Sequence, residues 1–458
     1  MKSNNLGAIV LAAGKGTRMR SKYPKVLQPI AGYPMAAYPL KLTRELGSSK
    51  TVMVVGHEAD LVKDVFSADG VDFVHQHEQL GTGHAVQVAW QELRDFRGTV
   101  LLLCADVPLL QRETLKKLVE NHISNNACVS VLTAEVEKPS GYGRIVRENG
   151  MIHSIVEEKD ANAEQKQITE INTGIFALEA PTVATLLQKL DNNNVQQEYY
   201  ITDIISLAAR EGLGVSSALL EDVAQSMGVN DRAQLASACA QMRARINHAH
   251  MLAGVSMEDP ASTYIDADVC IEADTYIQAG VHLNGTTHIE ADCIIESGTV
   301  ISDSHIGARS LIRSGSNIEG STLGQQCSVG PMAHLRPGTN LLGFNKIGNF
   351  VETKKADIGL RSQASHLSYI GDAELGEDVN IGCGTITCNY DGVNKHKTTI
   401  EDQVFVGSDT QFVAPVTIGR NSLIGAGSTI TKDVPPDSMA LSRAEQKIVP
   451  GWKNRRKS

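Results

Sequence analysis

The sequence predicts an α/β domain with a mostly parallel sheet, followed by a helical arm and a coiled domain of six-residue repeats. Two observations support this prediction. In the first half, short aliphatic strands alternate with helical stretches, as in layered α/β folds. In the second half, isoleucine or a close substitute recurs at every sixth residue. We therefore expect a first domain at 1–232, a helical linker at 233–253 and a second domain at 254–458.

The elements of the first domain follow from its apolar pattern. We expect strands at Ala8–Leu11, Thr51–Val55, Asp72–Val74, Val100–Leu103 and Cys128–Thr133, with helices at Pro34–Leu46 and Glu113–His122. Ligands in such folds bind beyond the carboxyl ends of the strands. The residues that directly follow each strand are therefore the first candidates for a binding site.

The six-residue ladder is the strongest pattern in the chain. It runs unbroken from Ile265 to Ile301, continues through slips of one residue to Ile347, and returns from Ile400 to Ile430. This period fits neither a 3.6-residue helix nor a hairpin sheet. It is typical of a hexapeptide β-helix, in which short strands form the sides of triangular coils.

Composition narrows the class of protein. The 458 residues exceed one ordinary core, and a net charge of −10 argues against a broad nucleic-acid footprint. No apolar run is long enough to span a membrane. Eight cysteines lack both a C-x-x-C pair and zinc-site spacing. We expect a cytoplasmic protein that binds neither nucleic acid nor membrane.

A glycine-rich turn follows the first strand and favours phosphate binding. Gly14 and Gly16 let backbone N–H groups approach a phosphate closely. Lys15, Arg18 and Lys25 can neutralise a polyphosphate. The turn lacks both the Walker spacing and the dinucleotide spacing of the G-x-G-x-x-G type.

Two further residues have a functional and a structural interpretation. Asp106 follows a buried strand, where a carboxylate can hold Mg²⁺ beside a triphosphate or can simply cap a loop. Thr82 lies in the turn Gln79–Ala85, where it belongs either to a base-recognition turn or to a helix cap.

The string from Leu11 to Lys25 resembles the signature of sugar-nucleotide pyrophosphorylases, which implies a Rossmann-like nucleotidyltransferase domain. The resemblance implies that Arg18 and Lys25 act in catalysis and that Asp106 and Asn230 bind Mg²⁺. It implies contacts to UTP or the sugar nucleotide at Leu11, Ala12, Ala13, Gly14, Lys25, Gln76, Gly81, Thr82, Gly143, Glu157, Asn172 and Asn230.

Polar residues cluster where the ladder is disturbed, between Ile347 and Ile400. The inserted loop Asn389–Lys395 is rich in turn formers, and insertions in solenoids map to one binding face. His366 lies in this stretch among lysines, asparagines and tyrosines. In that setting it is a candidate general base.

Motifs in this region extend the resemblance over nearly the whole chain. Arg336–Gly338, Gly348–Lys355, Gly382–Gly392 and Val406–Gln411 are similar to the bacterial bifunctional N-acetylglucosamine-1-phosphate uridyltransferase/glucosamine-1-phosphate acetyltransferases. The resemblance implies that Arg336 and Lys354 hold the sugar phosphate, Tyr369 and Asn380 position the sugar, and His366 is the general base. It implies acetyl-CoA contacts at Cys383, Asn389, Tyr390, Ser408, Ala426 and Arg443. Position 383 is commonly alanine in this family. We expect Glu352 to orient His366.

We expect the second domain to be a left-handed hexapeptide β-helix, and because such β-helices characteristically pack side by side as trimers, we expect a homotrimer. The resemblance implies that the protein acetylates glucosamine-1-phosphate with acetyl-CoA. It then transfers UMP from UTP to N-acetylglucosamine-1-phosphate, with Mg²⁺. One alternative is a single-activity pyrophosphorylase with a regulatory β-helix, but the His366 cluster and its loop argue against it. A non-catalytic scaffold conflicts with intact Arg18, Lys25 and Asp106. A metal site of the trimeric carbonic anhydrase type conflicts with the poor coil alignment of His334, His366 and His396.

Overall fold

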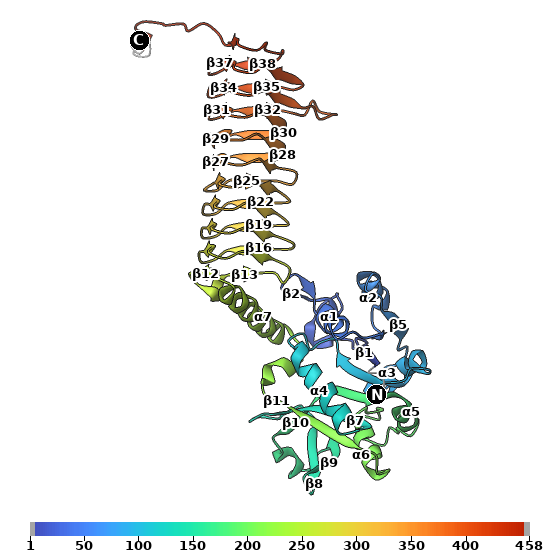
Figure 1. The fold of residues 1–458 in the computed structure, drawn as a ribbon. Helices are drawn as coiled ribbons and strands as arrows, with labels where there is room; N and C mark the ends of the chain where they lie inside the picture. The colour runs from blue at the N-terminus through green and yellow to red at the C-terminus, as the bar shows by residue number, and fades with distance from the viewer. Residues whose placement is uncertain (1–4, 453–458) are drawn as a thin grey trace. The chain divides into compact units, whose positions relative to one another are not determined.

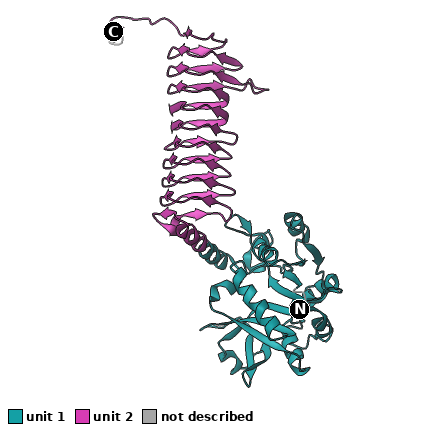
Figure 2. Ribbon diagram, in the orientation of Figure 1, with its two compact units in different colours: residues 1–242 teal, residues 243–458 magenta. Residues whose placement is uncertain are grey.

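The computed structural model describes residues 5–452 and divides into two compact units (Figures 1 and 2). Unit 1 comprises residues 1–242 and unit 2 residues 243–458. The boundary falls inside the helix α7, Arg232–Leu252, whereas the sequence prediction placed one boundary near each end of that helix.

Unit 1 is built on a mostly parallel sheet, which confirms the predicted α/β class (Figure 1). Its order is β11-β7-β10-β6-β1-β4-β5, and only β10 runs antiparallel to its neighbours in this path. The strands are β1 Leu6–Leu11, β4 Lys50–Val55, β5 Asp72–His75, β6 Thr99–Cys104, β7 Val129–Glu135, β10 Glu170–Glu179 and β11 Val215–Leu220, with a β8 Arg144–Glu148 and β9 Met151–Val156 hairpin beside β10. The helices are α1 Ala37–Glu45, α2 Ala59–Phe66, α3 Thr82–Trp90, α4 Arg112–Ser124, α5 Ala180–Leu187 and α6 Asp203–Arg210.

The central strands of unit 1, such as β1, are buried on both faces. Ile9 of β1 packs into one hydrophobic cluster, while its neighbours Ala8 and Val10 pack into the other. Strands covered on both sides lose the alternation of exposed strands, which is why they read as continuous apolar runs. Strand β1 pairs with β4 on one side and β6 on the other, so its carboxyl end opens at a change in strand order.

Unit 2 contains two long ladders of short parallel strands, from β13 Tyr264–Ile265 to β38 Thr429–Ile430 in the larger one. Every residue of the predicted six-residue ladder is buried in one continuous core. Register pairing stacks Ile265, Leu283 and Ile301 on successive coils. The hexapeptide β-helix is thereby confirmed (Figure 1).

The interior column does not stop between Ile347 and Ile400. Thr353, Ala364 and Thr387 face inward there and are buried. The hydroxyl of Thr387 donates to the carbonyl oxygen of Gly371 at 2.9 Å, so its burial leaves no unmade hydrogen bond. The disturbance seen in the sequence reflects smaller interior residues, and coil stacking continues through it.

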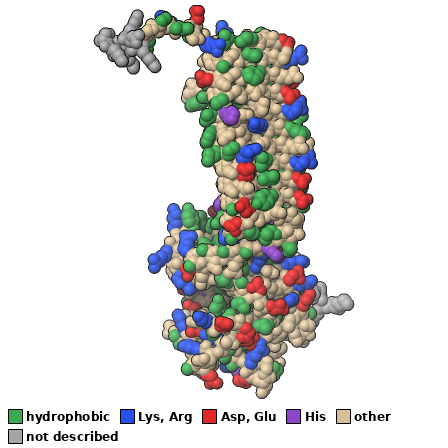
Figure 3. Space-filling view, turned by 90° about the vertical axis from the view of Figure 1, so that its left-hand side faces the viewer, with side chains coloured by type: hydrophobic (Ala, Val, Ile, Leu, Met, Phe, Trp, Pro, Cys, Tyr) green, Lys and Arg blue, Asp and Glu red, His purple; other side chains and the backbone are tan. Residues whose placement is uncertain are grey.

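The β-helix surface also carries hydrophobic side chains (Figure 3). Met332, Phe350 and Leu367 are exposed at 59%, 55% and 59%, and each has a positive φ. They occupy one corner of successive coils, because Phe350 N–H donates to Met332 O and Leu367 N–H to Asn349 O. Bulky residues rarely adopt this backbone conformation. The corner is therefore an apolar surface that the chain keeps despite a local cost.

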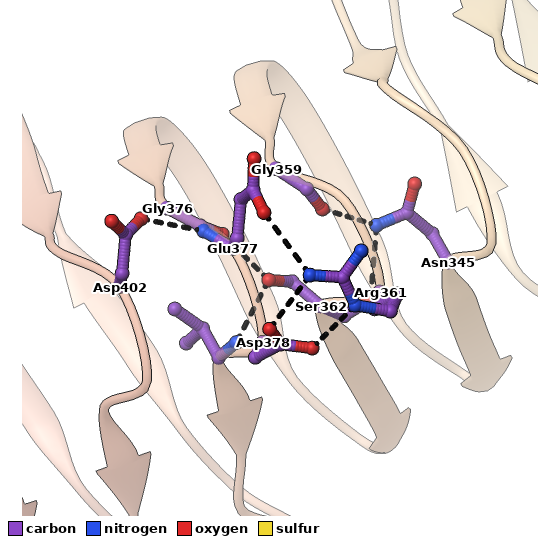
Figure 4. A network of polar contacts seen from close by, with 9 residues as sticks. Asn345, Gly359, Arg361, Ser362, Gly376, Glu377, Asp378 and Asp402 are labelled. Atoms are coloured by element: carbon purple, nitrogen blue, oxygen red, sulfur yellow. Dashed lines mark hydrogen bonds and ion pairs between the residues drawn. The ribbon is translucent and has the colours of Figure 1, made fainter. Parts of the chain in front are cut away.

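Another corner is held by polar side chains (Figure 4). The guanidinium of Arg361 donates to both carboxylate oxygens of Asp378 at 2.8 Å and to Glu377 at 3.1 Å. Buried Asn345 donates to the carbonyl oxygens of Gly359 and Ser362 at 2.7 and 3.0 Å. The Asn345 contacts satisfy backbone carbonyl groups of the turns, whereas the Arg361 contacts link side chains of successive coils.

Among residues 5–452, no helix is long and apolar enough to cross a membrane.

Candidate active sites

A cavity of about 330 Å³ opens at the carboxyl ends of β1 and β6 in unit 1. The predicted nucleotide residues that line it are Leu11, Ala12, Ala13, Gly14, Lys25, Gln76, Gly81 and Thr82, together with Asp106. Gln79, Cys104 and Glu198 also line it and were not predicted. The parallel sheet brings these separate segments together, because the carboxyl ends of its strands share one edge.

The glycine-rich loop leaves room for a ligand. A Cβ on Gly14 would meet no atom within 4 Å, whereas one on Gly16 would lie 2.7 Å from Lys25 Cβ. Gly16 has a φ of 58°, so glycine there permits both the turn and the packing of Lys25. The Gln79 side chain donates to Ala13 O at 2.7 Å and holds the loop from the other side.

The turn that precedes α3 is fixed by one nearby residue, Gln76, and by one residue distant in sequence, Ile201. Buried Gln76 donates from Nε2 to Gly81 O at 3.1 Å. The hydroxyl of Thr82 accepts from Ile201 N–H at 3.2 Å and makes no cap at the start of α3. The helix-cap interpretation of Thr82 is therefore wrong.

Lys25, Asp106 and Asn230 meet at the cavity. Lys25 Nζ donates to Asp106 Oδ2 at 2.5 Å and to Asn230 Oδ1 at 3.2 Å, so an ammonium lies between the two expected metal ligands. Both ligands are oxygens, the donors that Mg²⁺ prefers. The residues thus fit a hard cation, which Asp106 and Asn230 would hold beside the phosphates of a bound nucleotide.

Arg18 and Cys104 are close in sequence to Lys25 and Asp106, but neither is a charged group that lines the cavity. Arg18 is exposed on the short helix η1, Thr17–Met19, and does not line the cavity. Burial, and then the charge of Asp106, raise the pKa of the Cys104 thiol to about 12. Cys104 is consequently a neutral wall residue and no nucleophile.

The expected sugar residues form a second group within unit 1. Asn172 N–H donates to Gly143 O at 2.9 Å, and a Cβ on Gly143 would lie 3.4 Å from Glu157 Oε2. Burial raises the pKa of Glu157, while a hydrogen bond from Thr202 opposes that rise. Gly143, Glu157 and Asn172 do not line the cavity itself.

In unit 2, three cations gather beside one carboxylate. Arg336 Nη1 donates to Glu352 Oε1 at 2.7 Å. The neighbouring Lys395 ammonium is the main cause that lowers the pKa of Lys354, and the charge of Arg336 adds to the effect. Such a group of cations favours an anionic ligand. Lys395 was not predicted, although it ends the inserted loop that the sequence singled out.

The structure differs from expectation at Glu352. Its carboxylate pairs with Arg336, and His366 makes no side-chain hydrogen bond within residues 5–452. Glu352 therefore serves Arg336 in this structure rather than His366.

The two residues expected to position the sugar start strands in different ladders of unit 2. Tyr369 starts β30, Tyr369–Leu375, in the larger ladder, whereas Asn380 starts β31, Asn380–Ile381, in the other. Tyr369 instead lies near buried Asn389, whose amide donates to the tyrosine hydroxyl at 3.4 Å and to Asp372 Oδ2 at 2.5 Å.

Most expected acetyl-CoA residues share one corner of the β-helix. Backbone hydrogen bonds connect Leu367 to Gly384, Cys383 to Asp409 and Ser408 to Gly427 on successive coils. That corner therefore carries His366, Cys383, Ser408 and Ala426. Arg443 donates from Nη1 to Ala426 O at 2.9 Å, whereas Tyr390 stands in the inserted loop and donates to Gly392 O at 2.6 Å.

Two family models match separate parts of the chain. Residues 8–173 match the MobA-like NTP transferase domain. Residues 397–432 match the bacterial transferase hexapeptide (six repeats). These matches cover the strands of unit 1 that border the cavity and the coils that follow the inserted loop of unit 2.

Curated relatives match the chain from end to end. A "Bifunctional protein GlmU" from Syntrophotalea carbinolica is 58% identical over 99% of this chain and 98% of its own length. The protein of the same name from Geotalea uraniireducens is 53% identical over 99% and 100%. One from Shouchella clausii is 45% identical over 96% of both chains.

Proposed function

Because the chain belongs to the family of bifunctional GlmU proteins, we propose that it makes UDP-N-acetylglucosamine in two reactions. Unit 2 acetylates glucosamine-1-phosphate with acetyl-CoA. Unit 1 transfers UMP from UTP to the N-acetylglucosamine-1-phosphate so formed and releases pyrophosphate. The observation that carries the first-unit assignment is that Lys25 and Asp106 line the cavity and that Lys25 contacts both Asp106 and Asn230.

UMP transfer depends on position and charge. A phosphate oxygen of the sugar phosphate attacks the α-phosphorus of UTP, and the bond to pyrophosphate breaks. The nucleophile is already anionic near neutral pH, so no general base is needed. Lys25, with Arg18, offsets the repulsion between the two phosphates. Asp106 and Asn230 would hold Mg²⁺, which neutralises phosphate charge when bound.

Acetyl transfer needs a base. His366 takes a proton from the 2-amino group as the nitrogen attacks the thioester carbonyl, and the thiol of coenzyme A leaves. Arg336, Lys354 and Lys395 hold the phosphate of the acceptor. Cys383, Ser408 and Ala426 lie on the same corner column as His366, and Arg443 donates to Ala426 O, which supports a position for the acetyl donor beside the base.

We further propose that the chain assembles as a homotrimer. The hexapeptide domain suggests an oligomer, because such solenoids expose edges and faces that need a partner. The exposed column Met332, Phe350 and Leu367 supports this assembly. The cytoplasmic location expected from the sequence stays a prediction.

The test is thiol release from acetyl-CoA with glucosamine-1-phosphate as acceptor, in the wild type and in His366→Ala. We expect acceptor-dependent release that collapses in the variant while UMP transfer continues. If the folded wild type releases no thiol, the alternative of a pyrophosphorylase with a regulatory β-helix replaces this proposal.

A further inference from the structure

The segment 198–202 of unit 1 connects the nucleotide turn to the expected sugar site. Tyr199 N–H donates to Leu80 O at 2.8 Å, and Tyr199 O accepts from Gly83 N–H at 2.7 Å. Ile201 N–H donates to the hydroxyl of Thr82 at 3.2 Å. A Cβ on Gly81 would lie 2.5 Å from Tyr199 O, so this contact itself requires glycine in the turn.

The next residue, Thr202, uses its hydroxyl for a contact outside its own helix. It precedes α6 at a position where threonine commonly accepts a hydrogen bond from the helix backbone, but it makes no such cap. Its buried hydroxyl donates to Glu157 Oε1 at 3.0 Å instead. The Thr202 hydroxyl therefore bonds to the Glu157 carboxylate and does not cap α6.

The surroundings of Glu157 make this donor important. The ionisable groups around the carboxylate are Asp160, Asp203 and Tyr200, none of which supplies a positive charge. Burial raises the pKa of Glu157, and the Thr202 hydroxyl is the hydrogen bond that opposes the rise. Among residues 5–452, no cation pairs with Glu157.

We propose that Thr202 is a positioning residue that holds Glu157 in place for the sugar phosphate, and that residues 198–202 tie this carboxylate to the nucleotide turn. The inference rests on the proposed UMP transfer. Thr202 acts through Glu157, so its removal weakens use of the sugar phosphate and leaves use of UTP nearly unchanged.

The test compares Thr202→Val with Thr202→Ser by steady-state kinetics of pyrophosphate release from UTP and N-acetylglucosamine-1-phosphate. We expect the valine variant to raise KM for the sugar phosphate about tenfold, with KM for UTP changed less than about twofold. Serine restores the wild-type value. Thr185→Val is the matched control, because the Thr185 hydroxyl only donates to Thr182 O on an exposed helix face.

Two further measurements separate positioning from a general structural role. On a Glu157→Gln background, Thr202→Val should have little additional effect, because both changes break one interaction. The acidic limb of the pH profile for the sugar phosphate should shift to higher pH in Thr202→Val, since the carboxylate loses its donor.

The outcomes distinguish this inference from the proposed function. A wild type without sugar-dependent pyrophosphate release overturns the proposed UMP transfer. An active wild type whose Thr202→Val variant keeps its KM, or adds its full effect to Glu157→Gln, overturns the role of Thr202. KM for UTP in the same preparation reports whether unit 1 of the variant protein is intact.

Discussion

Single contacts determine the charge balance of both sites. In unit 1, one ammonium serves Asp106 and Asn230, so removal of any partner leaves a partly buried charge or dipole without compensation. In unit 2, Lys354 and Lys395 repel each other until an anion arrives. In both sites, at least one cationic side chain is already held in place before a ligand binds, and this positive charge favours a phosphate.

Asp106→Asn tests the first contact. The substitution removes the carboxylate that pairs with Lys25 and is expected to hold Mg²⁺, so UMP transfer should fall about 100-fold or more. Pyrophosphate release measures the effect, and Asp95→Asn, on an exposed residue of the same unit, is the control. An equal loss of acetyl transfer would show that the variant damages folding rather than the site.

Lys395→Ala tests the second contact. Loss of one cation should raise KM for glucosamine-1-phosphate about tenfold, with KM for acetyl-CoA unchanged. Thiol release measures both constants. Lys397→Ala is a suitable comparison, because Lys397 pairs with Glu374 at 2.5 Å. Equal KM values for the sugar phosphate in the two variants would contradict a phosphate role for Lys395.

At the scale of elements, the packing of α4 on β7 carries a titratable group. His122 of α4 is buried, and its Nδ1 lies 2.9 Å from the hydroxyl of Ser130 on β7. Burial lowers the pKa of His122 to about 4, from 6.5. The folded chain therefore keeps the His122 ring neutral at pH values where the unfolded chain already binds a proton on it.

The sign of the pH effect follows from this shift. As pH falls through 6.5 towards 4, the unfolded chain takes up a proton that the folded chain resists, so stability is lost. At pH 5 the loss should be about 2 kcal/mol relative to pH 7. Thermal unfolding of the wild type and His122→Gln at both pH values measures it. An equally steep pH dependence in the variant would exclude His122 as the cause.

At the scale of the whole molecule, each unit has its own core and its own expected reaction. The β-helix presents bulky apolar residues at strained corner positions, which a solitary chain has no reason to keep. A surface of that kind is expected to be covered by another copy.

Sedimentation velocity tests the assembly. We expect a mass about three times the 49.2 kDa of the chain. Phe350→Asp should weaken association, because it places a charge in the apolar column. Leu219→Asp, at an exposed position in unit 1, should leave the mass unchanged. A monomeric wild type would contradict the trimer.

Much of the fold can be read from local pattern. The five strands expected in unit 1 correspond to β1, β4, β5, β6 and β7, and the six-residue ladder marks the β-helix core. Buried residues recur at regular intervals in the strands of unit 1 and in the β-helix, so a short stretch of sequence is enough to predict each element. The nucleotide group from Leu11 to Thr82 was also predictable, since parallel strand ends share one edge.

By itself, the sequence determined the two architectures and most of the residues that line the cavity, because periodic burial and short motifs are local properties. Only the tertiary structure decided which side chains meet. Lys395 reaches Lys354 across 41 positions, Thr202 reaches Glu157 across 45, and Glu352 pairs with Arg336 rather than His366. These contacts depend on loop paths and coil stacking, which no periodicity in the chain encodes.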